Sequence, residues 1–130
     1  MTIYQHSLYY LEFNEKKKAI TFRWQDDHAD MSFEDFTEAC TNYAGFIAEY
    51  KVDQVIVDTR NFQYQMPEDF SGWRDNFHYP RLRRMGLQKM AFLMPESAMP
   101  YMKNVSAEEN QFAVHYFVKE TEAFRWLANH

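Results

Sequence analysis

The chain has 130 residues, of which 46% are hydrophobic and 18% aromatic, and its formal net charge is −5. This composition supplies enough apolar surface for one folded domain spanning residues 1–130, and it argues against general disorder. An acidic chain lacks the overall basic face that binding to nucleic-acid phosphates requires, so we expect no nucleic-acid partner.

Cysteine content and the N-terminal residues favour a cytoplasmic protein. Cys40 is the only cysteine, so the chain cannot form an internal disulfide, and a reducing compartment fits this. Residues 1–6 show neither the basic nor the apolar region of a signal peptide, and no window reaches the ~20 apolar residues of a membrane span. We therefore expect a cytoplasmic protein without a membrane span.

Two strands joined by a hairpin turn are predicted at the start of the chain. Residues 3–13 are rich in Tyr and Leu, and residues 19–24 alternate in the period of a strand. The polar run 14–18 between them predicts the turn. Residues 25–30 are predicted to form a loop. Their Asp and His side chains lack the spacing of a metal site, so we interpret them as a polar turn.

A long helix is predicted next. Ser32 is a favourable N-cap, and Glu34 and Asp35 place negative charge in the first turn. An apolar stripe that must face a sheet or another helix follows. Its members recur at spacings of three and four: Phe33, Phe36, Cys40, Tyr43, Ala44, Ile47 and Tyr50. As part of this stripe, Cys40 is expected to be a small buried hydrophobe.

A central strand is predicted at residues 55–57, where Val-Ile-Val forms an uninterrupted β-branched run. Such runs are typical of parallel strands that are buried on both faces. Asp58 would then lie at the carboxyl end of this strand.

A second helix is predicted from Pro67, because proline fits the first turn of a helix. Phe70, Trp73 and Phe77 follow at helical spacing. The helix is expected to end at Tyr79, since the residue before a proline, here Pro80, avoids the α region.

The remaining elements are shorter. Residues 87–94 predict a strand, residues 97–103 a short helix, and the region near Glu108 a helical or loop piece. The alternation at 112–118 predicts the last strand, and 121–127 the last helix. The order is β-β-α-β-α-β-α-β-α. Because helical crossovers require parallel pairing, it predicts an α/β domain with a single mixed, mainly parallel sheet and helices packed on it.

Several local segments carry a resemblance to a known family. They are Ile-Thr-Phe-Arg-Trp at 20–24, Met-Ser-Phe-Glu-Asp-Phe at 31–36, Val-Ile-Val-Asp at 55–58 with Arg60-Asn61, Gly-Leu-Gln-Lys-Met-Ala at 86–91, and Glu-Ala-Phe-Arg-Trp-Leu at 122–127 after Tyr116-Phe117. Together with the element order, they make the chain similar to the SpoIIAA-like fold of STAS domains, and to uncharacterised bacterial STAS-like proteins in particular.

The resemblance implies a regulatory domain that acts through a protein partner or as a homodimer. Sporulation-type STAS domains have a phosphorylatable serine in an Asp-Ser-Ser-Gly stretch. This chain has Thr59, Arg60 and Asn61 after Asp58. The resemblance therefore does not carry the phosphorylation switch over to this chain.

Asp58, Arg60 and Asn61 are the first candidate site, because ligands of open α/β sheets bind beyond the carboxyl ends of parallel strands. In the alternative interpretation, Asp58 caps a turn or pairs with a nearby arginine.

A second candidate is the basic cluster formed by Arg81, Arg83, Arg84 and Lys89, which could bind a phosphate, a carboxylate or an acidic partner. Its alternative is a solvated loop whose charges are paired. Trp73 and the other aromatic and Met side chains could line an apolar cavity for a lipid-like ligand, or form ordinary core.

No nucleophile–base pair, metal-ligand set or glycine-rich phosphate loop is readable, so we assign no catalytic residue, no metal and no cofactor. The first hypothesis is a non-enzymatic regulatory or protein-interaction module. The second is a carrier or sensor of a small amphiphilic or anionic, lipid-like ligand. The residues predicted to bind that ligand are Asp58, Arg60, Asn61, Trp73, Arg81 and Arg84.

Overall fold

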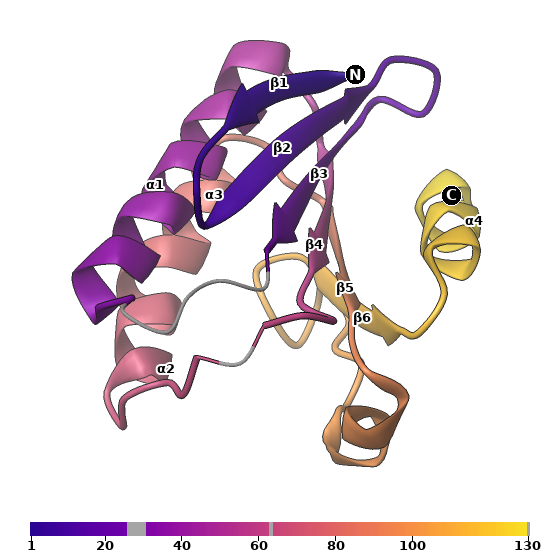
Figure 1. Cartoon of the computed structure of the whole chain (residues 1–130). Coiled ribbons are helices and arrows are strands. Elements are labelled where there is room, and N and C mark those ends of the chain that lie inside the picture. Colours follow the sequence, from indigo (N-terminus) through magenta and orange to yellow (C-terminus); the bar gives the residue numbers. More distant parts are fainter. Residues whose placement is uncertain (26–30, 63, 130) are drawn as a thin grey trace.

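The computed structural model describes residues 1–25, 31–62 and 64–129. Its centre is one six-stranded sheet in which the strands lie in sequence order (Figure 1). The first two strand pairs are antiparallel and the other three are parallel, which confirms the predicted α/β class with a mixed, mainly parallel sheet. The strands are β1 (Thr2–Gln5), β2 (Tyr9–Asn14), β3 (Ala19–Trp24), β4 (Gln54–Asp58), β5 (Lys89–Leu93) and β6 (Ala113–Phe117).

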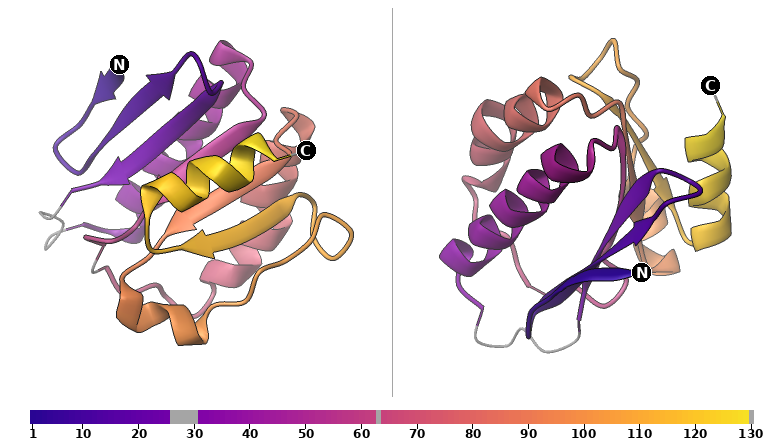
Figure 2. Two further views of the ribbon diagram at one scale, coloured as in Figure 1. Left: turned by 90° about the vertical axis from the view of Figure 1, so that its right-hand side faces the viewer. Right: turned by 90° about the horizontal axis from the view of Figure 1, so that it is seen from above.

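Helices cover both faces of the sheet (Figure 2). They are α1 (Phe33–Tyr50), α2 (Phe70–Trp73), the π-helix η1 (Arg74–His78), α3 (Tyr79–Arg84), the 3₁₀-helix η2 (Glu96–Tyr101) and α4 (Glu120–Ala128). The helices α1, α2 and α3 lie on one face, here called the inner face, and α4 lies alone on the other, the outer face. None of the described helices is long and apolar enough to cross a membrane.

Alternating side chains of the strands divide between two hydrophobic cores. On β4, Val55 and Val57 belong to the inner core beneath α1, whereas Ile56 belongs to the outer core with Ala123 and Leu127 of α4. Every residue of β4 is buried, as predicted for a strand covered on both faces. The side chains of β4 therefore face α1 on the inner face of the sheet and α4 on the outer face.

The long helix α1 begins where the sequence predicts. Ser32 is its N-cap, with the Asp35 N–H donating to Ser32 Oγ at 3.1 Å and the Ser32 N–H donating to Asp35 Oδ2 at 3.1 Å. This reciprocal pair is a capping box. Cys40 and Ile47 of the predicted stripe are buried against the sheet. The prediction of a buried Cys40 is confirmed.

The predicted single strand at 3–13 is wrong, because the chain reverses within it. His6 and Leu8 lie in a turn in which the His6 N–H donates to the Tyr9 carbonyl at 2.9 Å and the Leu8 N–H donates to His6 Nδ1 at 3.1 Å. The two halves, β1 and β2, then pair antiparallel. The hairpin turn expected between β2 and β3 is confirmed. The loop predicted at 25–30 falls, from residue 26 on, outside the described residues.

The predicted end of the second helix at Tyr79 is also wrong. The helices α2, η1 and α3 follow one another without a break from Phe70 to Arg84, and Pro80 lies in the first turn of α3. A proline normally clashes with the carbonyl of the preceding turn. Here that turn is the wide η1, where the Tyr79 N–H donates to the Arg74 carbonyl, and the wider turn makes room for the ring.

Two smaller differences concern the helix ends and the element order. The second helix begins at Phe70 rather than at Pro67, which lies in the turn before it. The element expected at 97–103 is the 3₁₀-helix η2. With the extra N-terminal strand, the order becomes three strands, then α1, β4, the segment α2 to α3, β5, η2, β6 and α4.

Candidate functional site

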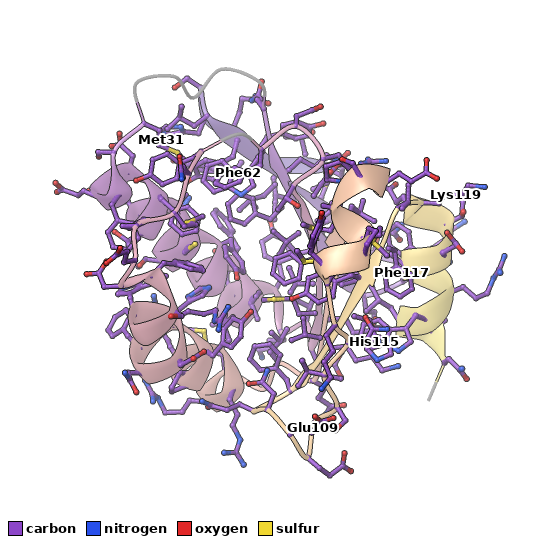
Figure 3. All side chains as sticks on the ribbon, turned by 90° about the horizontal axis from the view of Figure 1, so that it is seen from below. Met31, Phe62, Glu109, His115, Phe117 and Lys119 are labelled. Carbon is purple, nitrogen blue, oxygen red and sulfur yellow. The ribbon has the colours of Figure 1, made fainter. Side chains whose placement is uncertain are left out.

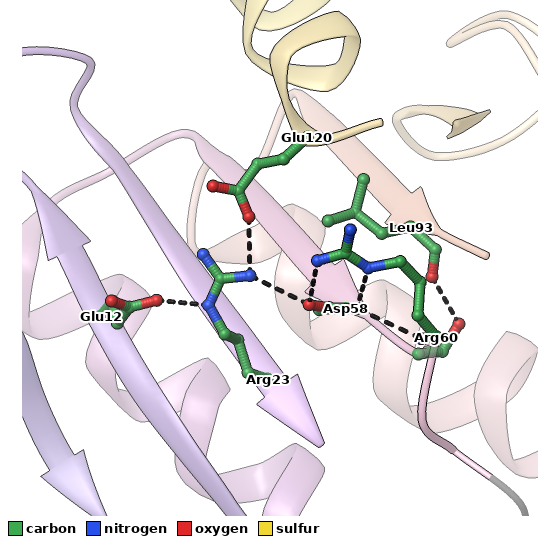
Figure 4. Close-up of polar contacts among 7 residues, drawn as sticks. Glu12, Arg23, Asp58, Arg60, Leu93 and Glu120 are labelled. Carbon is green, nitrogen blue, oxygen red and sulfur yellow. Dashed lines mark hydrogen bonds and ion pairs between the residues drawn. The ribbon is translucent and has the colours of Figure 1, made fainter. Parts of the chain in front are cut away.

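A network of five charged side chains surrounds the predicted site at Asp58 (Figure 4). Asp58 Oδ2 accepts from Arg23 Nη1 at 2.9 Å and from Arg60 Nη2 at 2.8 Å, and Asp58 Oδ1 accepts from Arg60 Nε at 3.0 Å. Arg23 also pairs with Glu12 on β2 and, at 2.6 Å, with Glu120 at the start of α4. The network thus ties β2, β3, β4 and α4 together on the outer face.

The charges within the network largely compensate one another. Its three carboxylates and two guanidinium groups give a net charge of −1. Burial raises the pKa of Asp58, but hydrogen bonds and charge from Arg60, together with the bond from Arg23, outweigh it and hold the pKa below its ordinary value. The Arg60 backbone N–H also donates to Asp58 Oδ1 at 3.1 Å, so Asp58 caps the turn that follows β4. This is the geometry of the alternative interpretation, in which Asp58 pairs and caps.

The structure does not bring the six predicted ligand-binding residues together. Asp58 and Arg60 meet on the outer face, and Asn61 lies exposed in the turn beside them. Trp73 lies among the helices of the inner face, where its ring stacks on His78 with centroids 5.1 Å apart. The other two are on α3. Arg81 donates to the Thr41 carbonyl at 3.4 Å, and Arg84 is exposed.

An apolar pocket of about 230 Å³ lies on the inner face, between the sheet and the helices α1, α2, η1 and α3. Most of its strand residues come from the carboxyl halves of β3, β4, β5 and β6: Phe22, Trp24, Val57, Phe92 and Tyr116, whereas Met90 lies near the start of β5. These strands are parallel, so their carboxyl ends meet at one edge of the sheet, where open α/β sheets bind their ligands.

Aromatic rings and sulfur atoms form most of the pocket wall. Phe36 of α1, Phe62 and Phe70 contribute rings, and Met66, Met90 and Met94 contribute flexible thioethers. Figure 3 shows Phe62 between the helices of the inner face and the sheet, whereas His115 and Phe117 lie on the side of α4. The Phe62 ring lies 4.8 Å from Trp24 and 5.9 Å from Phe36, which closes the wall between β3 and α1.

One hydrogen-bonded pair supplies polar atoms to the wall. The Tyr43 hydroxyl and His78 Nε2 lie 2.8 Å apart, and both side chains are buried. Burial and the nearby charge of Arg81 lower the pKa of His78 to about 4, so its imidazole is neutral at pH 7. Burial raises the pKa of the Cys40 thiol and keeps it protonated.

Among the described residues that line the pocket, Arg74 is the one that carries a full charge. It is the first residue of η1, and its guanidinium lies over the rings of Phe70 and Tyr79, 5.6 Å and 5.4 Å from their centroids. The pocket therefore combines apolar walls, neutral polar groups that include the Tyr43–His78 pair, and one cation.

Sequence reasoning named two residues of the network, Asp58 and Arg60, as candidate site residues. In the pocket, it named Tyr43 only as part of the apolar stripe, and it assigned no site role to His78 or Arg74. The signal that pointed toward the pocket was the load of aromatic and methionine side chains, which was interpreted as either core or cavity. The described residues contain no cluster of His, Cys, Asp and Glu that could hold a metal ion.

Two further hollows lie elsewhere on the surface. One, of about 420 Å³, lies between the β1–β2 hairpin and α1, and the other, of about 480 Å³, lies on the outer face beside Glu12, Arg23 and Glu120. Both are larger than the inner pocket, but polar and charged side chains make up much of their lining. They lack the apolar enclosure that holds a small ligand.

Comparisons of the chain with known protein families, with curated proteins and with solved structures find no match. The function is therefore argued from the geometry of the two sites.

Proposed function

We propose that the chain is a non-enzymatic carrier or sensor whose small, mainly apolar ligand occupies the pocket on the inner face. The observation that carries this proposal is the position and lining of the pocket. It lies at the carboxyl edge of the parallel strands and is walled by aromatic rings and methionines. Small-molecule sites are typically concave, mainly apolar and placed at this edge of an α/β sheet.

Flexible wall segments support a binding role. Methionine side chains adapt their shape to a ligand, and three of them contribute to the wall. The π-helix η1 lies directly against the pocket, and π-turns inside helices occur frequently at functional sites. Both features favour a wall that can adjust to a ligand.

The polar groups also favour binding over catalysis. Cys40 is a protonated thiol, and His78 is a neutral imidazole whose Nε2 is already bonded to Tyr43. A catalytic cysteine or histidine instead needs an activated thiolate or a base that reaches its substrate. These groups are suited to shape the pocket and to provide polar contacts within it.

Pocket volume limits the size of the ligand. An engineered protein cavity of about 150 Å³ holds one benzene molecule, so about 230 Å³ has room for roughly nine non-hydrogen atoms. Benzyl alcohol is a neutral probe close to this size.

The proposal is tested by titrating the protein with benzyl alcohol and following the methyl resonances of Met66, Met90 and Met94 by NMR. We expect saturable shifts of these methyl groups. Cys40→Leu adds volume inside the pocket and should weaken binding at least about tenfold. Ala48→Leu adds the same side chain at an exposed position of the same helix and should leave binding unchanged. Pocket methyl groups that do not respond in the folded wild-type protein would contradict the proposal.

A second proposal is that the module acts through a protein partner or as a homodimer, as the STAS-like resemblance implies. It is supported by the outer face of β1 and β2, which α4 leaves uncovered (Figure 2). Sedimentation equilibrium tests self-association directly. A dimer mass that falls to one subunit on dilution would support a homodimer, and a single-subunit mass at all concentrations would exclude it.

A further inference from the structure

The guanidinium of Arg74 is held in place at the pocket wall by two aromatic rings. It lies over Phe70 on one turn of the helical segment and over Tyr79 on the next. Its side chain is 35% exposed, so the group belongs partly to the pocket and partly to solvent. A guanidinium fixed by stacking loses little conformational entropy when it forms hydrogen bonds. Its planar fork of N–H donors matches the two oxygens of a carboxylate.

Asp75 is the anionic partner that the described contacts give Arg74, and it holds the arginine weakly. Arg74 Nε donates to Asp75 Oδ1 at 2.9 Å, but Nη2 lies 3.5 Å from Oδ2, at the limit of a hydrogen bond. Asp75 is 54% exposed, and ion pairs in such positions contribute little to stability. A carboxylate arriving from the pocket can therefore compete for the fork.

The charge of Arg74 is paired differently from the charges of Arg23 and Arg60. Arg23 and Arg60 share three carboxylates, one of which, Asp58, is buried. In contrast, no Asp or Glu is present among the described residues that line the pocket. The pocket thus presents one positive charge to a ligand.

One positive charge in an apolar wall favours an anion with a single negative charge. A monocarboxylate that takes the place of Asp75 on the guanidinium of Arg74 would leave one charge of each sign at the site. A phosphate monoester carries a charge of about −1.5 to −2 near neutral pH. One guanidinium would not neutralise it, so part of its negative charge would be buried without a partner. The neutral His78 and Tyr43 offer no second cation to compensate for it.

We infer that the ligand of this pocket is a small monocarboxylate, with an apolar ring or chain in the pocket and its carboxylate on the fork of Arg74. This inference rests on the proposed carrier or sensor function and names the class of its ligand. With roughly nine non-hydrogen atoms in total, benzoate has the required size and charge.

The test compares benzoate with benzyl alcohol, which has a similar ring but no charge. Binding to the wild-type protein, to Arg74→Gln and to Arg84→Gln is measured by calorimetry or NMR titration. We expect the wild-type protein to bind benzoate at least about tenfold more tightly than benzyl alcohol, and Arg74→Gln to abolish this preference. Arg84→Gln removes the same charge from an exposed position outside the pocket and should retain it.

A third variant tests the competition with Asp75 and does not depend on replacing a packed side chain. Asp75→Asn removes the exposed carboxylate and should tighten benzoate binding several-fold while leaving benzyl alcohol unaffected. Phenyl phosphate should bind the wild-type protein more weakly than benzoate. If phenyl phosphate bound the wild-type protein more tightly than benzoate, the inference of a monocarboxylate ligand would be wrong.

The outcomes separate the two proposals. If benzyl alcohol binds in the pocket but benzoate gains nothing from Arg74, the carboxylate inference is wrong and the proposed carrier or sensor function stands. If neither probe shifts the methionine methyl groups of the pocket, both are wrong. Circular dichroism of each variant confirms that a change in binding is not a loss of fold.

Discussion

At the scale of single residues, the most unusual group is His78. It is buried on the inner face, bonded to Tyr43 and stacked against Trp73. Burial and the charge of Arg81 lower its pKa from 6.5 to about 4. An unfolded chain binds a proton at this histidine well before the folded protein does. The folded state is therefore destabilised as the pH falls from about 6.5 to about 4.

We expect His78→Gln to flatten the dependence of stability on pH in this window. In the wild-type protein, this one group lowers the free energy of unfolding by up to about 3 kcal/mol between the two pKa values. The measurement is urea denaturation at pH 7, 6, 5 and 4.5. His6→Gln, at an exposed position, serves as the control and should keep the wild-type slope. An unchanged slope in His78→Gln would show that other groups cause the acid sensitivity.

Asp58 has the opposite electrostatic character, because its arginine partners outweigh the effect of burial and lower its pKa. Its contribution is present above the unfolded pKa and is lost as the pH falls through the lower, folded pKa. We expect Asp58→Asn to cost about 1–3 kcal/mol in the free energy of unfolding at pH 7, because Arg23 and Arg60 lose their shared negative charge and one of the two acceptor oxygens becomes an NH2 donor. Asp75→Asn, at an exposed pair, should cost much less. Equal losses in the two variants, measured by urea denaturation, would contradict this.

At the scale of elements, α1 and the segment from α2 to α3 place the pocket. The start of α1 is fixed by its capping box, and its Phe36, Cys40 and Tyr43 then face the pocket. The second segment changes from α to π and back, which directs Arg74, His78 and Tyr79 toward the same space. Both elements therefore define the pocket wall by their local backbone geometry.

Ser32→Ala should destabilise the protein by about 0.5–2 kcal/mol, because the Asp35 N–H loses the acceptor that satisfies it at the helix start. Thermal and urea denaturation measure the loss. Ser71→Ala removes the same hydroxyl from an exposed position of α2, which has no side-chain cap, and should change stability little. If the two variants were equally stable, the capping box would not stabilise α1.

At the scale of the whole molecule, one sheet separates two cores of unequal size. The inner core extends over β1 to β6 beneath α1 and α3 and contains the pocket, whereas the outer core is a smaller cluster beneath α4. The outer core contains Ile56, Ala91 and Leu93 from the sheet, with Leu127 from the helix. Glu120 adds an ion pair to Arg23, so α4 is held by packing along its length and by charge at its start.

We expect Leu127→Ala to cost about 2–5 kcal/mol in the free energy of unfolding, because it leaves a cavity in a core that has few other large side chains. Tyr101→Ala, at a position that is 84% exposed, should change it by less than about 0.5 kcal/mol. Urea denaturation followed by tryptophan fluorescence measures both. A small effect of Leu127→Ala would show that α4 contributes little to the stability of the sheet.

Elements with local signals could be predicted from the amino-acid sequence. Ser32 with Asp35 predicted the start of α1, and the β-branched run at 55–57 predicted a strand buried on both faces. These signals work because a cap, an apolar stripe or a buried run is encoded within a few neighbouring residues. The class of the fold followed from the order of such elements.

The reversal of the chain near His6 and the meeting of distant side chains became visible in the folded structure. The turn at His6 is hidden in an aromatic run, and Pro80 continues a helix because the π-helix before it widens the turn. Tyr43 and His78 are 35 positions apart, so their hydrogen bond has no signature in the sequence. The pocket likewise forms only when the parallel strands align their carboxyl ends beneath the helices. Local preferences specify elements, whereas sites depend on contacts between residues far apart in the chain.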